Sequence, residues 1–260
     1  MKTFQGKTVL LTRSDEANRE AEALLKKKGV HTLSLPTIRF TDPDSWEACD
    51  DAIIGIRNYD AVVFTSRNAV RAFLKRIEVI DPESTEILRT IRTYAVGERT
   101  LDSLESARIP AIMAEGRTAG DLAESVGKDV QGKRFFFPKS NIAREVLPEA
   151  LKARGAVVDE AIVYKTEVPT PKDLDLVRNA LRLGAVDFLF FFSPSAVFNF
   201  TQMIGTGFTE SLMVAVIGPT TAAAARSAGF VVSVVAEKPT TEGLIDSVDR
   251  FLAHSPSIHT

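Results

Sequence analysis

An internal repeat is the feature of this sequence that most constrains its fold. Two long segments share pattern and length: GKTVLLTRSDEANREAEALLKKKGV, from Gly6 to Val30, and GKRFFFPKSNIAREVLPEALKARGA, from Gly132 to Ala156. Further pairs match as AVVFTSRNAV (61–70) with FLFFFSPSAV (188–197), YAVGERTLDSLESARI (94–109) with AVIGPTTAAAARSAGF (215–230), and TAGDL (118–122) with TTEGL (240–244). Because the same units occur twice, the chain is expected to contain two domains of similar fold.

Each repeated unit begins with a short apolar run. These runs are rich in Val, Ile and Phe and are too short for buried helices, so they are predicted to be strands. Continuous apolar runs are typical of strands covered on both faces, as in parallel α/β sheets. The expected strands are Thr8–Thr12, Ala61–Phe64, Tyr94–Val96, Arg134–Phe137, Asp187–Phe192, Val214–Ile217 and Val231–Val235. The sequence therefore predicts the α/β class.

Helices are predicted to follow the strands directly. After Ser14, Ser66 and Ser140, apolar residues recur at helical spacing and form one apolar stripe in each segment. Each Ser is expected to be an N-cap, because its hydroxyl can accept from an unpaired backbone N–H. Pro194 and Pro219 stand where the first helical residue of their segments is expected.

Two polar, Pro-containing stretches indicate how the chain passes between the domains. Residues 1–36 plus 172–260 are predicted to form one discontinuous α/β domain and residues 43–164 the other, with 37–42 and 165–171 as hinge linkers. The chain would then start one parallel-sheet domain, complete the other and return through a two-stranded linker. This double crossover gives each domain one full set of strands. A tandem split near residue 130 is the alternative that the residues leave open.

Composition argues against several classes of function. The formal net charge of −2 produces no overall positive field that would attract a nucleic acid, although local Arg and Lys could line a cleft for a small anion. The one Cys and three scattered His have no metal-ligand spacing, and no stretch is apolar enough for a signal peptide or a membrane span. Nucleotide-binding glycine motifs and a Ser–His or Cys–His pair are also missing. We therefore expect a cytoplasmic protein with no metal and no cofactor.

The candidate site consists of the residues at the carboxyl ends of the strands, where open parallel α/β sheets bind ligands. These residues are Arg13, Ser66, Gly97, Lys139, Ser193 and Gly218. The helix N-termini that follow them offer unpaired N–H groups and a positive dipole end to a carboxylate or phosphate. Each of these residues also has a purely structural interpretation. The Ser residues could be helix caps, the Gly residues could form tight turns, and Arg13 could belong to a salt bridge. Tyr164 could equally be a wall of the core or of the hinge.

At these residues the sequence resembles the uroporphyrinogen-III synthase family over about residues 6–252. The resemblance rests on the order of VLLTR (9–13), LPTI (35–38), FTSRNAV (64–70), VGERT (96–100), AIVYKT (161–166), FFSPSAV (191–197), IGPTT (217–221) and AEKPTTEGL (236–244). Each motif alone is weak, but in this order the set is specific. The resemblance implies a monomeric, two-domain α/β enzyme with a two-stranded linker.

The resemblance also implies the reaction and the site. The substrate would be hydroxymethylbilane, four linked pyrroles that each bear an acetate and a propionate. Loss of the ring-A hydroxyl, attack by ring D to give a spiro intermediate, and reclosure would yield uroporphyrinogen III with ring D inverted. Tyr164 matches the family's tyrosine and would assist loss of the hydroxyl. The expected substrate-binding residues are Arg13, Ser66, Gly97, Thr100, Lys139, Arg144, Ser193, Ser195, Gly218, Thr221 and Thr240.

The expected partners are the small-molecule substrate and, transiently, hydroxymethylbilane synthase, with no nucleic acid and no membrane. Two other functions fit the same fold. One is a non-catalytic, two-lobed binder of a small anion, and the other is a regulator that keeps the synthase fold. The Tyr164 hydroxyl discriminates a binder from an enzyme, because a binder has no need of an acid.

Overall fold

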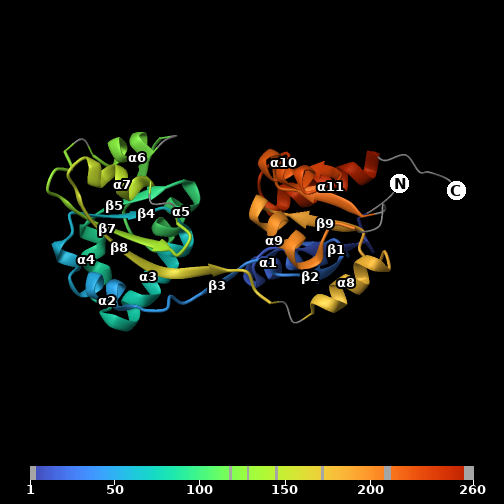
Figure 1. Cartoon of the computed structure of the whole chain (residues 1–260), viewed down its shortest axis with the longest axis horizontal. Helices are drawn as coiled ribbons and strands as arrows, with labels where there is room; N and C mark the ends of the chain where they lie inside the picture. Colours follow the sequence, from blue (N-terminus) through green and yellow to red (C-terminus); the bar gives the residue numbers. More distant parts are fainter. Residues whose placement is uncertain are drawn as a thin grey trace. The chain divides into compact units, whose positions relative to one another are not determined.

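The structure is a computed structural model that describes residues 4–116, 119–127, 129–143, 146–170, 173–207 and 212–254. The chain divides into two units, the first made of Met1–Arg39 with Glu167–Thr260 and the second of Phe40–Thr166. Both divisions fall inside the predicted linkers, 37–42 and 165–171. The chain therefore leaves the first unit once and returns once (Figure 1). The more exact bounds 1–36, 43–164 and 172–260 stay a prediction.

The first unit is a parallel sheet with helices on both faces. Its strands run in the order β11-β10-β9-β1-β2. They are β1 (Thr8–Leu11), β2 (His31–Ser34), β9 (Phe188–Phe191), β10 (Met213–Val216) and β11 (Val232–Val235), and the helices are α1 (Asp15–Lys27), α8 (Leu174–Arg182), α9 (Pro194–Ile204), α10 (Pro219–Ser227) and α11 (Thr241–His254). Val9 and Leu11 share a core with α1 and α11, whereas Leu10 shares the other core with α8, α9 and α10. This two-sided burial explains why the inner strands β1, β9 and β10 are continuous apolar runs, whereas the edge strand β2, with sequence HTLS, is not.

The second unit repeats this architecture. Its strands run in the order β3-β8-β7-β4-β5-β6. They are β3 (Arg39–Thr41), β4 (Ala61–Phe64), β5 (Arg92–Val96), β6 (Ile112–Ala114), β7 (Arg134–Ser140) and β8 (Val157–Glu167). The helices are α2 (Glu47–Ile54), the 3-10 turn η1 (Ile56–Asn58), α3 (Arg67–Ile80), α4 (Ser84–Thr90), α5 (Glu98–Ser106), α6 (Ala119–Val126) and α7 (Val146–Ala153). Helices α2 to α5 share one core with Val62 and Phe64, and α6 and α7 share the other with Val63.

Five strands of the second sheet follow the order of the first sheet once the repeat is taken into account, and β3 adds a sixth strand beside β8. The elements β1, β2, β9, β10 and β11 of the first unit correspond to β7, β8, β4, β5 and β6 of the second. Both sheets therefore have the doubly wound order 2-1-3-4-5, and the second unit is a circular permutation of the first. The α/β class, the two similar parallel-sheet domains and the double crossover are confirmed.

Four glycines show the repeat at the level of single hydrogen bonds. The Gly6 N–H donates to the Gly29 carbonyl at 2.8 Å, and the Gly132 N–H donates to the Gly155 carbonyl at the same distance. All four have φ between 70° and 84°, the left-handed region that side chains with a Cβ avoid. These glycines close the strand–helix–strand unit at its base in both copies.

Strand β7 corrects one expectation drawn from the sequence. The sequence predicts a helix cap at Ser140, but this residue is the last of β7, and helix α7 is described from Val146 to Ala153. The reason is the long neighbouring strand β8, which continues to Glu167 and supplies a partner for Ser140 at Tyr164. Ser66 and Ser193, by contrast, are N-caps whose hydroxyls accept from Asn68 and Ala196.

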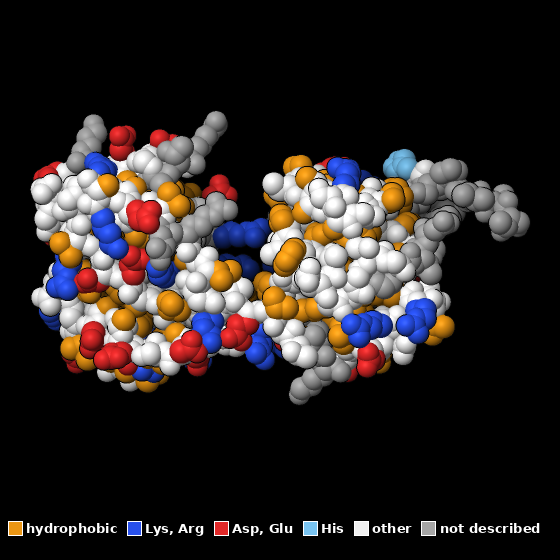
Figure 2. Space-filling model, in the orientation of Figure 1, with side chains coloured by type: hydrophobic (Ala, Val, Ile, Leu, Met, Phe, Trp, Pro, Cys, Tyr) orange, Lys and Arg blue, Asp and Glu red, His pale blue; other side chains and the backbone are white. Residues whose placement is uncertain are grey.

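The described surface carries both signs of charge. Lys and Arg are interspersed with Asp and Glu on the face drawn in Figure 2, in keeping with the net charge of −2. Among the residues that the structure describes, no helix is both long and apolar enough to span a bilayer.

Candidate functional site

The predicted site residues gather at the carboxyl edges of the two sheets. In the second unit these are Ser66 after β4, Gly97 after β5, and Lys139 and Tyr164 near the ends of β7 and β8. Because neighbouring strands are parallel, their carboxyl ends meet at one edge. The strand order reverses between β7 and β4, and such switch points open a crevice for ligands. Ser66 and Tyr164 flank this point.

Tyr164 and Ser66 are joined by a hydrogen bond of 3.0 Å between their hydroxyl oxygens, and either can be the donor. The residues come from β8 and the start of α3, so the bond passes over the end of β7. The Ser66 oxygen also accepts from the Asn68 N–H at 3.1 Å. The half-buried Tyr164 ring packs against the core on the α2–α5 side and meets Phe40 edge-on, with centroids 5.8 Å apart. The ring is thus structural, while the hydroxyl lies at the carboxyl edge.

This pair can deliver a proton. If Ser66 donates its hydroxyl hydrogen to the Tyr164 oxygen, the tyrosine O–H is left to donate to a ligand. The same bond then stabilises the negative charge that develops on the phenol oxygen. The N-terminus of α3 adds a positive dipole end beside Ser66. A tyrosine held in this way is suited to general acid catalysis.

Lys139 has a protein partner. Its ammonium lies 2.6 Å from Glu160, which also binds Lys152 at 2.7 Å. Burial alone would raise the pKa of the Glu160 carboxyl, but the hydrogen bonds from the two lysines outweigh burial, and the pKa lies below its ordinary value. Glu160 is one carboxylate shared by two ammonium groups, so it balances only part of the positive charge of Lys139 and Lys152.

Arg13 is positioned by the edge of the first sheet. Its backbone N–H donates to Asn18 at 2.9 Å, and its guanidinium donates to the Thr241 hydroxyl at 3.2 Å and lies 4.8 Å from the Phe192 ring centroid. Thr240, the residue before Thr241, caps α11, because its hydroxyl accepts from the Gly243 N–H at 3.0 Å. The structure thus brings Arg13 to the start of α11, beside one of the predicted binding residues.

The serines of the first unit form a second hydroxyl pair. Ser193 accepts from the Ala196 N–H at 3.1 Å, and its hydroxyl lies 3.0 Å from that of exposed Ser195. Ser193 follows β9 as Ser66 follows β4, so the two caps are equivalent in the repeat. The two repeats are offset by 126 residues, from Gly6 to Gly132, so the position equivalent to Tyr164 is Ile38, after β2 ends at Ser34. The hydrogen-bonded tyrosine therefore belongs to the second unit alone.

Gly97 and Gly218 differ in what their backbones require. Gly97 has φ 85°, which favours glycine, whereas Gly218 has an extended φ of 173° that any residue adopts. A Cβ at Gly218 would meet no atom within 4 Å. Each Gly precedes a helix whose third residue, Thr100 or Thr221, is buried within its own unit at 4% and 2% exposure. Glycine at 218 is therefore not demanded by the fold of the chain itself.

The described residues supply neither a metal cluster nor a reactive thiol. Arg144 lies outside the residues that the structure describes. No group of His, Cys, Asp and Glu within the described ranges could hold a metal ion. Cys49 is buried, and burial raises the pKa of its thiol to about 12, so this thiol is not a reactive nucleophile.

A buried polar network at the edge of the first sheet was missed by the sequence reasoning. The Asn18 amide donates to Ser34 at 2.8 Å and is 2% exposed, and the Asn199 amide donates to the Thr37 carbonyl at 2.8 Å. Thr12 donates to the Phe190 carbonyl at 2.6 Å. Such residues look like surface positions in a sequence, because their partners are distant along the chain. They hold the strand end that carries Arg13.

Fold and site together define a class of protein: a two-unit doubly wound α/β chain, with helix caps, backbone amides and one hydrogen-bonded tyrosine at the sheet edges. The family model for "Uroporphyrinogen-III synthase HemD" matches residues 5–246. The chain belongs to the uroporphyrinogen-III synthase family, an enzyme family of tetrapyrrole biosynthesis whose members are lyases. The resemblance read from the ordered motifs is confirmed.

Curated relatives and solved structures agree with this assignment. The chain is 29% identical over 234 residues to the uroporphyrinogen-III synthase of Chlorobaculum parvum, covering 89% of this chain and 93% of that one. It is 28% identical over 256 residues to that of Synechococcus elongatus, covering 95% and 96%. A crystal structure of a mutant uroporphyrinogen III synthase from Thermus thermophilus matches with a TM-score of 0.66 at 19% identity, covering 96% of this chain and 100% of that one. The Helicobacter pylori enzyme matches with a TM-score of 0.59 at 19% identity, covering 92% and 96%.

Proposed function

We propose that this chain converts hydroxymethylbilane to uroporphyrinogen III, with inversion of ring D and release of water. Family membership supports the reaction, and the observation that carries the proposal is the hydrogen bond between Tyr164 and Ser66 at the switch point of the second sheet. The non-catalytic anion binder receives no support from the relatives, which are named as synthases.

Tyr164 is the proposed acid. Its O–H donates to the hydroxyl that departs from ring A, which leaves as water and produces the electrophilic azafulvene. The Ser66 hydroxyl stabilises the charge left on the phenol oxygen. The net reaction releases only water, so Tyr164 regains a proton when ring D loses the hydrogen of its free α-carbon at the end of the rearrangement. No metal and no cofactor is needed for these proton transfers.

Positioning is the other part of the proposed mechanism. The substrate carries an acetate and a propionate on each pyrrole, and the edges of both sheets supply helix N-termini that suit carboxylates. We assign carboxylate binding to side chains or backbone at Arg13, Ser66, Gly97, Thr100, Lys139, Arg144, Ser193, Ser195, Gly218, Thr221 and Thr240. Holding a flexible chain in its reactive conformation supplies a large share of the rate enhancement in reactions of this type.

The finer assignments belong to the same proposal. The chain acts as a monomer in the cytoplasm and meets hydroxymethylbilane synthase transiently, because its substrate is labile. The decisive experiment incubates the purified chain with freshly made hydroxymethylbilane and separates the type I and type III products. We expect the type III isomer, undiminished by a chelator. A product mixture identical to that of the reaction without protein would refute the proposed function.

A further inference from the structure

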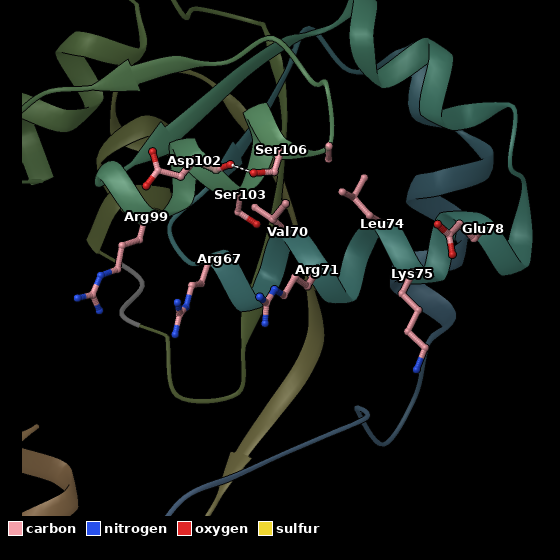
Figure 3. Close-up of a pocket in the computed structure, with 11 residues that line it drawn as sticks. Arg67, Val70, Arg71, Leu74, Lys75, Glu78, Arg99, Asp102, Ser103 and Ser106 are labelled. Atoms are coloured by element: carbon pink, nitrogen blue, oxygen red, sulfur yellow. Dashed lines mark hydrogen bonds between the residues drawn. The ribbon is translucent and has the colours of Figure 1, made fainter. Parts of the chain in front are cut away.

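A groove in the second unit lies between helices α3 and α5, next to the Ser66–Tyr164 pair. Its volume is about 570 Å³. Figure 3 shows the charged ends of its basic residues on one side of the groove, where they point away from the helix axes. The lining holds four cations and two carboxylates: Arg67, Arg71, Lys75 and Arg99 against Glu78 and Asp102. The chain has a net charge of −2, so this groove is a local reversal of its overall charge.

The cations of α3 form one stripe that starts at the candidate site. Arg67, Arg71 and Lys75 are each four residues apart, so they lie on one face of α3 at intervals of about 6 Å. Arg67 is the first helical residue and follows Ser66, whose hydroxyl binds Tyr164. The stripe therefore extends about 12 Å from the catalytic pair along a single helix. A ligand that reaches Tyr164 can place further anionic groups along it.

This stripe works against the stability of its own helix. Cations at the N-terminal end oppose the helix dipole, and like charges four residues apart repel each other. Helix α3 has Arg67 and no acidic residue in its first turn. Helix α1 has the favourable arrangement, with Asp15 and Glu16 in its first turn and Lys26 and Lys27 in its last. An anionic ligand in the groove would reverse the sign of this contribution in α3.

The repeat provides an internal comparison. Helix α9 is the equivalent of α3 in the first unit, and its residues at the three stripe positions are Pro194, Phe198 and Gln202. The position equivalent to Arg99 is Thr220 in α10. The fold therefore does not require any of the four charges, since an equivalent pair of helices forms without them. The stripe distinguishes one unit of a pseudo-symmetric molecule from the other.

We infer that the α3–α5 groove binds the carboxylates of the pyrroles that do not react, and that it fixes which end of the linear tetrapyrrole meets Tyr164. This inference rests on the proposed function. The substrate has chemically similar rings along its length, so an enzyme built from two similar units needs an asymmetric feature to orient it. A row of cations on α3 that is missing at the equivalent positions of α9 is such a feature. Its contribution is uniform binding, which lowers KM and leaves kcat nearly unchanged.

The test is the double variant Arg67→Gln with Lys75→Gln, assayed as type III formation against hydroxymethylbilane concentration. Surface charge pairs contribute modestly, so we expect KM to rise about three- to tenfold with kcat nearly unchanged. The KM of the variant should also depend less on salt concentration, because fewer charges are screened. The matched control is Lys26→Gln with Lys27→Gln, which removes equal charge from α1 and should leave KM unaltered. The melting temperature should hold or rise in the groove variant and fall slightly in the control.

Binding without turnover separates the two proposals. Uroporphyrin III, a stable polycarboxylate macrocycle, can be titrated by quenching of Trp46, the single tryptophan. Weaker uroporphyrin binding by the groove variant supports the groove even if the parent forms no type III product, and in that case only the proposed reaction fails. A parent that forms type III product, together with a groove variant unchanged in both KM and uroporphyrin binding, overturns the groove inference and leaves the reaction intact.

Discussion

Replacing Tyr164 by Phe removes one oxygen atom from the second unit and isolates the role of the tyrosine hydroxyl. The Tyr164 hydroxyl bonds to Ser66 at 3.0 Å, while the ring packs against Phe40 and the core. Phe keeps the ring, and Ser66 keeps the Asn68 N–H as its donor, so the cap of α3 survives. The substitution therefore tests the proton donor without dismantling the structure around it.

The expected effects on stability and turnover are of different size. A single neutral hydrogen bond contributes about 0.5–1.5 kcal/mol to stability, and a half-buried bond belongs at the lower end. General acid catalysis contributes about 10²–10⁴-fold. Because the azafulvene also forms without an acid, we expect a drop of about 10²-fold in kcat for type III product, which equals about 2.7 kcal/mol of transition-state free energy.

Tyr59→Phe is the matched control within the same unit. Its hydroxyl donates to Asp159 at 3.0 Å, and burial, followed by this hydrogen bond, raises the pKa of Tyr59 to about 12. A hydrogen bond to a carboxylate contributes more than one between hydroxyls, so Tyr59→Phe should cost about 1–2 kcal/mol of stability and leave turnover intact. Urea unfolding measures the stabilities, and type III product resolved from type I measures the rates.

Two outcomes decide the role of Tyr164. Equal type III turnover for Tyr164→Phe and the parent would remove this residue from the chemistry and leave positioning as the whole account. If the acid depends on Ser66, the double variant Tyr164→Phe with Ser66→Ala should be little slower than Tyr164→Phe alone, because the serine then acts through the tyrosine. Fully additive losses would show that Ser66 acts on the substrate independently. Ser66→Ala should also cost about 0.5–2 kcal/mol of stability as a lost N-cap.

The other predictions concern the sheet edges and the core. Gly218→Ala should leave the melting temperature unchanged but raise KM, since the backbone accepts Ala and the added Cβ would obstruct only a ligand. Gly97→Ala should lower the free energy of unfolding by about 1–2 kcal/mol, because Gly97 has a φ of 85°. A destabilised Gly218→Ala protein would contradict this expectation. The lowered pKa of Glu160 means that its stabilisation is present above the unfolded-state pKa and is lost as pH falls through the folded-state value. Glu160→Gln should therefore lower the free energy of unfolding at pH 7 by about 1–2 kcal/mol and flatten its dependence on pH below about pH 4.5. Urea unfolding midpoints measured against pH would show both effects. Parallel pH profiles for the variant and the parent would exclude the ion pair as the cause of the pH dependence. Cys49, with its pKa at about 12, should resist alkylation at pH 7.5 until the chain is unfolded, and rapid labelling of the native protein by mass spectrometry would disprove its burial.

Local features of this protein are readable from the sequence. The apolar runs predict seven of the eleven described strands, because a strand covered on two faces needs apolar side chains at every position. The partly exposed strands β2, β3, β6 and β8 have no continuous buried run and were not predicted. Ser66, Ser193, Pro194 and Pro219 mark helix starts correctly, since caps and first-turn prolines act within a few residues. The repeat predicts two similar units, and the ordered motifs predict the family.

Tertiary structure decided which of these residues meet. Ser66 and Tyr164 are far apart along the chain, and only the strand order β8-β7-β4 brings their hydroxyls to 3.0 Å. Ser140 has the sequence context of a cap because its neighbours have helical spacing, yet pairing with the long strand β8 keeps it in the sheet. Lys139 has the position of an anion ligand in the sequence, and the register of β7 against β8 gives it Glu160 as a partner. Periodicity and capping record interactions within one or two turns of chain, whereas register and strand order follow from the burial of whole faces, which no short segment encodes by itself.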